Sequence, residues 1–311
     1  MSEYHYKQEF DDRYAYLNRR LSVLQWTMRA LVLGTMALTI YLASRLGSMF
    51  ILVVGFGAAV WTALALRKRI YEVEDETRTL KSYAAAAILD QRLSPLKRYD
   101  PFAMMDRKEI EHVVIPVSWE EITGSDLVEG VYKGVPLRFS DVKMVSFIED
   151  GQGEVHEQTA FGGQVFTLRM KSSIKGKVWI GRFADNESSI LSQAAYEKRI
   201  GGAVMSVAAL EKQSVFASNA EAAAELLTDG YAGKLGQALG RGDGRLFLCF
   251  DGDTLFGAKD CRRDLFENKY EMDWETMTKT DQRELDSFLA LIDCLTDDPA
   301  LFDRESGGPP P

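Results

Sequence analysis

The stretch Leu46–Leu66, LGSMFILVVGFGAAVWTALAL, contains 21 consecutive residues without a charged side chain. About 20 residues of α-helix are needed to cross the roughly 30 Å hydrocarbon core of a bilayer. The sequence therefore predicts a transmembrane helix over about residues 46–66.

A second apolar run precedes it, from Ala30 to Ser44. This run is too short to span alone, but it becomes long enough if the helix begins near Leu24 or Trp26. Arg29 would then lie about one turn inside, with its guanidinium extended toward the headgroups, and the Trp26 ring would lie at the interface. We predict a hairpin over residues 26–66, with spans at about 24–44 and 46–66.

The connecting stretch Tyr41–Ser48, YLASRLGS, is short enough that the two helices must be antiparallel neighbours. Small residues at four-residue spacing, Ala30 with Gly34 and Gly55 with Ala59, favour their close approach. Two alternatives are a pair of buried helices in a soluble core and a cleavable signal peptide. The second is disfavoured because a long polar segment precedes the first run and no small-residue cleavage site follows it.

The basic residues indicate the orientation of the hairpin. Basic side chains gather on both flanks, whereas the tip carries only Arg45. The flanking residues are Lys7, Arg13, Arg19, Arg20 and Arg29 on one side and Arg67, Lys68, Arg69, Arg78 and Lys81 on the other. Because cytoplasmic flanks are enriched in Lys and Arg, both termini are expected on the cytoplasmic side.

Charge and cysteine content exclude some classes of protein. The chain has 37 Lys and Arg against 46 Asp and Glu, a net charge of −9, and the acidic excess lies after Leu66. Such a region is repelled by phosphate backbones, so nucleic acid is not an expected partner. Cys249, Cys261 and Cys294 form no CxxC motif, which indicates free thiols in a reducing compartment rather than a disulfide framework.

Helical periodicity continues on both sides of the predicted hairpin. Apolar residues at spacings of three and four predict an amphipathic helix over residues 1–25 and a helical stalk over residues 67–94 that together form an antiparallel coiled coil. The seam positions are Phe10, Tyr14, Leu17, Leu21, Leu24 and Met28, and Ile70, Val73, Thr77, Leu80, Ala84 and Ala87. The alternative is that each stripe packs on the globular domain. Pro95 and Pro101 are expected to end the stalk.

Residues 101–296 predict a cytoplasmic α+β domain with a mainly antiparallel sheet. Period-two alternation in DLVEGVYKGVPLRFSDVKMVSF indicates strands around a turn at Lys133–Gly134, and GQVFTLRMK and GKVWIGRF are similar. RLFLCF indicates a central strand that turns at Asp251–Asp253. Ser218 and Glu221 have capping-box spacing before AEAAAELL, and DQRELDSFLALIDCL predicts a C-terminal helix. Residues 297–311 are expected to form a disordered tail.

Three blocks carry a resemblance to a known family: EGVYKGVPLRFSDVKM, LEKQSVFASNAEAAAELLT and RLFLCFDGDTLFGAKDCRRDLFE. Together with the hairpin they resemble a bacterial two-transmembrane family whose cytoplasmic domain has no assigned function. The family has an Arg-Tyr pair where this chain has Ala223 and Ala224, and a Gly where it has Thr167. The resemblance implies a bacterial inner-membrane protein and supplies no catalytic residues.

No motif assigns catalytic, cofactor-binding or metal-binding residues. Glu154, His156 and Glu157 in EVHEQ could form a general base with its orienting group, but they are better explained as a charged surface loop. FDGDTLF resembles the start of a calcium loop, yet Arg262 occupies the position where a bidentate Glu is required. RGDGR, residues 241–245, is typical of a turn.

Two alternatives accompany the function expected from these patterns. The expected function is a membrane-anchored, non-enzymatic interaction or scaffold protein that binds a protein partner or itself. The first alternative is a membrane-bound enzyme of unrecognised type with its site near His156 or Asp251. The second is a lipid-sensing module, which the acidic balance disfavours unless a local basic patch exists.

Overall fold

The computed structural model describes residues 3–47, 49–151, 153–181, 203–205, 207–211, 213–240, 244–266 and 273–304. The chain divides into two compact units. The helical unit comprises Met1–Ala87 with Met272–Met277, and the sheet unit comprises Ile88–Glu271 and Thr278–Pro311.

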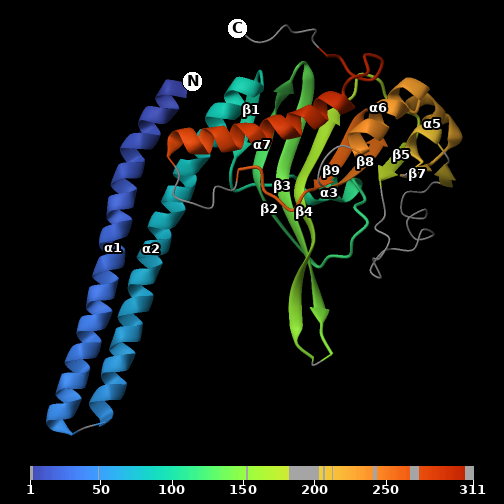
Figure 1. Cartoon of the computed structure of the whole chain (residues 1–311). Coiled ribbons are helices and arrows are strands. Elements are labelled where there is room, and N and C mark those ends of the chain that lie inside the picture. The colour runs from blue at the N-terminus through green and yellow to red at the C-terminus, as the bar shows by residue number, and fades with distance from the viewer. Residues whose placement is uncertain are drawn as a thin grey trace. The chain divides into compact units, whose positions relative to one another are not determined.

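Two long helices form most of the helical unit: α1, Glu3–Leu46, and α2, Met49–Arg92, whose last turns belong to the sheet unit (Figure 1). They connect through Gly47, which has φ +61°, a conformation that glycine adopts at little cost. The connection is therefore shorter than the stretch Tyr41–Ser48 predicted from its polarity, because Tyr41–Leu46 remain helical.

The predicted seam lies where α1 and α2 pack together at the end away from the connection. Phe10 and Leu17 of α1 and Val73, Leu80 and Ala84 of α2 are buried there. The same cluster contains Trp274 and Met277, and the Phe10 and Trp274 ring centroids are 5.3 Å apart. The seam thus buries apolar side chains from three segments rather than from two helices alone.

The sheet unit is α+β, as the sequence predicts, and every strand pair in its described part is antiparallel. Its strands lie in the order β1-β2-β3-β4-β9-β8-β5-β7-β6. They are β1 Leu96–Asp100, β2 Glu121–Tyr132, β3 Val135–Glu149, β4 Val155–Arg169, β5 Lys177–Gly181, β6 Ala203–Met205, β7 Ser214–Ala217, β8 Arg245–Asp251 and β9 Thr254–Asp260.

Both faces of the sheet are covered, and each carries its own core. On one face pack α5 Ala220–Leu226, α6 Asp229–Gly240, most of α7 Trp274–Leu295 and the last turns of α2. On the other face lie α3 Arg107–His112 and the segment that follows it. There the buried Trp179 indole donates to the Val113 carbonyl at 2.9 Å. The described residues also form a short 3₁₀ turn, Ala208–Leu210.

Several strand predictions are confirmed. The β2–β3 turn lies at Lys133–Gly134, where both residues have positive φ, as a tight hairpin requires. Val135, Leu137 and Phe139 point into the helix-side core together with Phe166, Leu168 and Met170. β8 is buried between β5 and β9 and turns at Gly252.

Other expectations differ from the structure. Asn219 caps α5 by accepting from the Ala222 amide at 2.7 Å, so the predicted cap at Ser218 is wrong; the Ser218 hydroxyl accepts from the Lys177 amide instead. β1 pairs with β2, so the sheet unit begins before residue 101.

The segment 297–304 is ordered rather than part of a disordered tail. Leu301 and Phe302 are buried in the helix-side core, and the Leu301 carbonyl accepts from the Lys171 amide at 2.8 Å. Burial of these two apolar side chains and the hydrogen bond to Lys171 favour packing of the segment against the sheet unit. Residues 305–311 lie outside the described residues.

Candidate functional site

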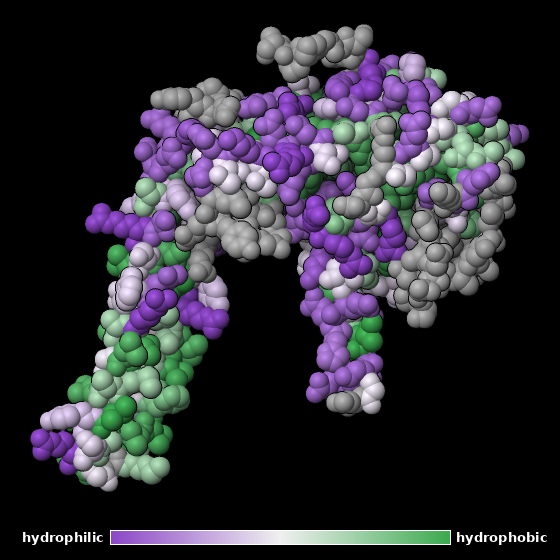
Figure 2. Space-filling model, viewed as in Figure 1, coloured by the Kyte–Doolittle hydropathy of each residue, from purple (hydrophilic) through white to green (hydrophobic). Residues whose placement is uncertain are grey.

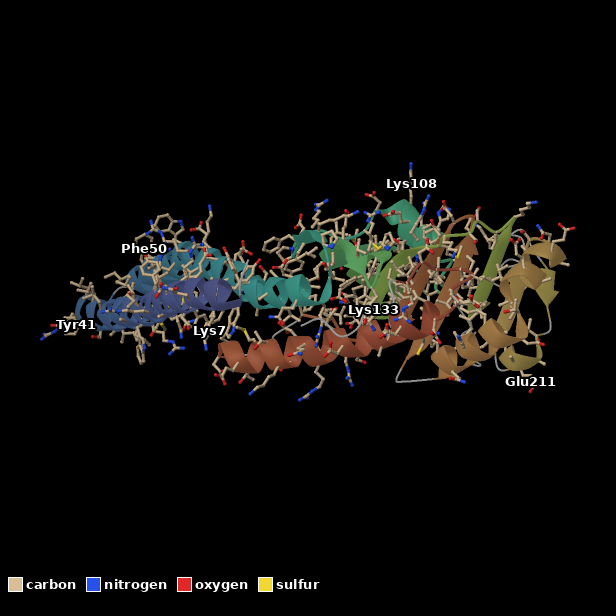
Figure 3. The ribbon with its side chains drawn as sticks, turned by 90° about the horizontal axis from the view of Figure 1, so that it is seen from above. Lys7, Tyr41, Phe50, Lys108, Lys133 and Glu211 are labelled. Carbon is tan, nitrogen blue, oxygen red and sulfur yellow. The ribbon has the colours of Figure 1, made fainter. Side chains whose placement is uncertain are left out.

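The surface of the helical unit is the strongest functional feature of the described chain. α1 and α2 are both long and apolar enough to cross a membrane, and only 6% of the most apolar 18-residue stretch of each is buried. Phe50 and Trp61 expose 74% and 75% of their surface. Figure 2 shows hydrophobic side chains covering this part of the hairpin, and Figure 3 shows Tyr41 and Phe50 pointing outward.

The two helices approach each other closely at Gly55. A β-carbon placed on Gly55 would lie 2.1 Å from Thr39 Oγ1, whereas one on Gly34 would meet nothing within 4 Å. Ala59 is buried, but Ala30 is exposed. Of the two predicted small-residue pairs, therefore, only Gly55 and Ala59 lie at the interhelical contact.

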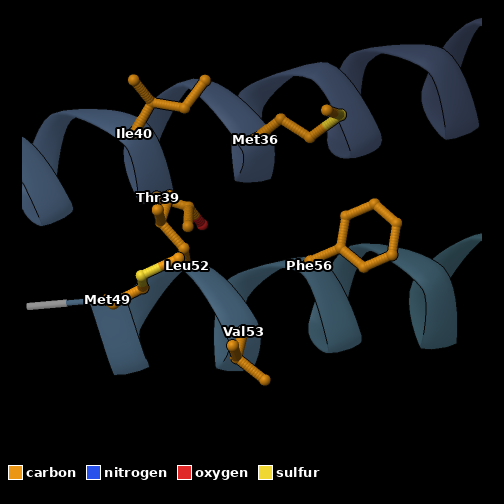
Figure 4. Close-up of a pocket in the computed structure, with 7 residues that line it drawn as sticks. All are labelled: Met36, Thr39, Ile40, Met49, Leu52, Val53 and Phe56. Atoms are coloured by element: carbon orange, nitrogen blue, oxygen red, sulfur yellow. The ribbon is translucent and has the colours of Figure 1, made fainter.

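Shallow apolar grooves flank this contact. One, of about 390 Å³, is lined by side chains of both helices around Thr39, including Met36, Leu52 and Phe56 (Figure 4). A second, of about 530 Å³, includes Gly34, Phe50 and Gly55. Wide apolar grooves with almost no polar atoms offer hydrophobic contact without the convergent polar groups that orient a specific ligand.

Arg29 and Trp26, which the sequence places near the membrane boundary, contact each other. The Arg29 guanidinium carbon lies 5.5 Å from the centroid of the exposed Trp26 ring. Such a pair combines an amphipathic ring with a long basic side chain, the two residue types that favour the headgroup region.

His156 lies on β4, near the tip of the β3–β4 hairpin, rather than in a loop. Its Nε2 is 3.0 Å from Asp150 Oδ2, so the partner is Asp150 and not the Glu154 or Glu157 expected from proximity in sequence. Potential ligand atoms of Asp150, Glu154 and His156 lie within 4.8 Å of one another. The histidine and glutamates are exposed, and an exposed acidic group of this kind is common without any bound ion.

The acidic turn at Asp251 is held by basic residues. Lys177 Nζ is 3.0 Å from Asp251 Oδ2, and His112 Nε2 is 3.7 Å from the same oxygen. Asp253 forms an ion pair with Arg169. The two carboxylates therefore have separate cationic partners instead of converging on one position. Of RGDGR, only Gly244 and Arg245 lie within the described residues.

Sequence reasoning missed a buried polar network on the helix side of the sheet. Asp141 on β3 accepts from Gln164 Nε2 at 2.8 Å and from the Leu265 amide at 2.7 Å. Cys261 Sγ lies 3.3 Å from Gln164 Oε1. These contacts attach the chain after β9 to the sheet. Asp141 is one of four charged residues in β3, and the strand sequence gives no local signal that this carboxylate faces inward.

A second buried carboxyl lies beside the first. Asp126, with φ +59° at a bulge in β2, accepts from the Tyr99 hydroxyl at 2.7 Å. Burial raises the pKa of Asp126 and raises the pKa of Asp141 well above its usual range. Desolvation likewise raises the pKa of Tyr99, and the carboxylate of Asp126 adds to that effect.

The three cysteines form no disulfide, and the structure gives each a different environment. Cys249 is buried on β8, and desolvation raises the pKa of its thiol to about 12, so it is unreactive at neutral pH. Cys261 belongs to the polar network, and Cys294 lines a cavity of about 230 Å³ between α6, α7 and the start of β8.

No family model matches this chain, and no curated protein matches it. Among solved structures, it is similar to the mycobacterial trehalose monomycolate transport factor A, TtfA, at 11% sequence identity and a TM-score of 0.33. That similarity covers 63% of this chain and 88% of the other. A likeness this distant carries no argument about function.

Proposed function

We propose that this protein is a membrane-anchored, non-enzymatic interaction or scaffold protein. The α1–α2 hairpin crosses the bacterial inner membrane twice, both termini lie in the cytoplasm, and the acidic sheet unit binds a protein partner or a second copy of the chain. The family resemblance agrees with this assignment.

One observation carries the proposal: large apolar side chains are exposed along both helices of the hairpin. Exposed apolar patches on soluble monomers rarely exceed a few hundred Å². On the hairpin, Leu31, Phe50, Phe56 and Trp61 are all more than one third exposed. Transfer of such a surface from water to hydrocarbon is favourable at about 25 cal/mol per Å².

The backbone supports the same interpretation. A helix satisfies its own amide and carbonyl groups, as a membrane span must. The three threonines of α1 in or beside the span, Thr27, Thr35 and Thr39, donate their hydroxyls to carbonyls four residues earlier at 2.7 Å. These polar side chains therefore add little to the cost of insertion.

Fractionation tests the anchor. The full-length protein is expected in the membrane pellet after alkaline carbonate washing and in the supernatant only with detergent. Single cysteine replacements at Ser44 and at Ser2, made in a chain whose three native cysteines are changed to alanine, then test orientation with a membrane-impermeant maleimide. Ser44 is expected to react from outside the cell and Ser2 only after lysis. Native protein wholly in the carbonate supernatant would refute the anchor, and the reverse labelling would refute the orientation.

A further inference from the structure

The cavity between α6, α7 and the start of β8 combines an apolar wall with one basic side chain. Leu239 of α6, Leu246 of β8 and Leu291 and Cys294 of α7 provide apolar and thiol surface, and Lys259 lines the same space. Arg245 also borders the cavity, but its guanidinium carbon lies 5.7 Å from the ring centroid of Phe247, which belongs to the core on the other face of the sheet. It has a volume of about 230 Å³, and both polar and apolar atoms contribute to its surface.

The two basic residues have different electrostatic roles. Arg245 Nη2 lies 2.8 Å from Asp260 Oδ2, and the Asp260 side chain is almost fully buried, so this pair is close to neutral. The Lys259 side chain is partly buried and makes no hydrogen bond or ion pair with the described residues. Among those residues, its positive charge at the cavity has no anionic partner.

The position of Lys259 on β9 directs its side chain to the helix side of the sheet. Its cross-strand neighbour on β8 is Leu246, which belongs to the helix-side core, and its neighbour on β4 is Gln164. Cross-strand neighbours project from the same face of a sheet. A half-buried ammonium without an anion is costly, and an anion at this place would stabilise it.

We propose that this cavity binds the anionic headgroup of a single-chain amphiphile beside Lys259, with the chain packed against Leu239, Leu246 and Leu291. One water molecule occupies roughly 30 Å³ of liquid, so the cavity admits on the order of eight atoms of that size. That capacity fits a short acyl chain, whether it comes from a free fatty acid or from a single-chain phospholipid. The proposal does not depend on the membrane anchor.

Photo-crosslinking of the full-length protein tests the site. The probe is octanoate carrying a diazirine near its methyl end, and labelled peptides are identified by mass spectrometry. The protein is held in phosphatidylcholine nanodiscs, or in buffer if fractionation finds it soluble, so failure of the anchor does not affect the test. Labelling is expected on α6 and α7 peptides that contain Leu239 or Leu291.

Three variants separate charge from cavity. Lys259→Met gives an unbranched side chain one atom shorter than lysine and without its charge, and it is expected to raise the probe concentration for half-maximal labelling about tenfold. Leu291→Trp fills the cavity and is expected to abolish labelling; Leu239→Trp serves the same purpose if Leu291→Trp does not fold by circular dichroism. Lys279→Met on exposed α7 surface is the matched control and is expected to leave labelling unchanged.

Competition identifies the head group and its source. Unlabelled octanoate is expected to compete and octanol to compete at least tenfold more weakly. Stronger competition by octanoyl lysophosphatidate than by octanoate would assign the phospholipid source, and the opposite order would assign the free acid. Equal labelling of wild type and Lys259→Met, equal competition by octanol, or labelling confined to other peptides would overturn the proposal.

Discussion

The helical hairpin and the sheet unit place the same kinds of side chain in opposite environments. In the hairpin, Trp61 and Phe50 are largely exposed, whereas in the sheet unit Trp179 and Phe166 are fully buried. The backbone of both units is regular and internally hydrogen-bonded. The two units therefore differ in the polarity of the surface that they expose to the surrounding medium. Under the proposed function, water surrounds the sheet unit and hydrocarbon surrounds the hairpin.

The largest effect is expected from Trp179→Ala. Removing this side chain leaves a cavity beside Phe216 and Phe247 and loses the hydrogen bond to Val113. The free energy of unfolding of the sheet unit should fall by about 3–5 kcal/mol, measured by urea denaturation in detergent. Trp61→Ala, the matched exposed tryptophan of the hairpin, should leave that transition unchanged; an equal loss in both variants would break the comparison.

Phe56→Arg places a charge in the middle of the second predicted span. The expected penalty for insertion is about 2.5–3.5 kcal/mol, which should shift a measurable fraction of the protein out of the carbonate-resistant pellet. Tyr71→Arg, equally on an exposed helical surface but beyond residue 66, should fractionate as wild type. If both variants fractionate alike, the exposed surface around Phe56 is not in lipid.

Gly55→Ala tests the interhelical contact. The added methyl group would meet the Thr39 side chain and should destabilise the hairpin by about 1–3 kcal/mol, measured by titration with sodium dodecyl sulfate. Gly57→Ala on the same helix meets no atom within 4 Å and corrects for helix propensity. If Gly55→Ala is as stable as Gly57→Ala, the two helices are farther apart at Gly55 than in this structure.

Asn219→Ala should cost about 1 kcal/mol in the unfolding of the sheet unit, because the first turn of α5 loses its side-chain cap. Glu221→Ala is the informative control, since a capping box based on Ser218 and Glu221 would make both residues matter. Thermal denaturation followed by circular dichroism distinguishes them. A larger loss of stability in Glu221→Ala than in Asn219→Ala would favour the capping box of Ser218 and Glu221 over the Asn219 cap seen in the structure.

The smallest effect is expected to be a change in pH dependence. Because the pKa of Asp141 is raised in the folded state, its stabilising contribution is complete below the unfolded pKa of about 3.9 and is lost as pH rises through the folded value. Asp141→Asn should therefore lose less stability than wild type between acidic and neutral pH. Parallel stability curves for the two proteins would show that Asp141 does not titrate in this range.

Local patterns predicted much of the fold. The two long apolar helices and the turn at Lys133–Gly134 are each determined by neighbouring residues, and they were predicted correctly as elements. The order of strands was not predicted: β5 lies between β8 and β7, and not beside β4 which precedes it. Strand pairing depends on contacts between distant segments, which period-two alternation does not encode.

The candidate sites were harder to predict than the fold. His156 drew attention because of its residue type, yet its partner Asp150 is brought near by the hairpin turn. Nothing in the sequence singled out Lys259, because its place in a cavity depends on α6 and α7 packing over β9. The small residues Ala30 and Gly34 matched a packing motif but lie on the open side of the helix, since four-residue spacing defines a stripe and not the direction it faces.

The packed segment after α7 has a practical meaning for anyone who shortens or labels this protein. A chain truncated after Thr296 would lack Leu301 and Phe302. The part of the helix-side core that these two side chains cover would then be exposed to water. Reporter proteins and affinity handles are better joined after Arg304, whose guanidinium still pairs with Asp293 on α7.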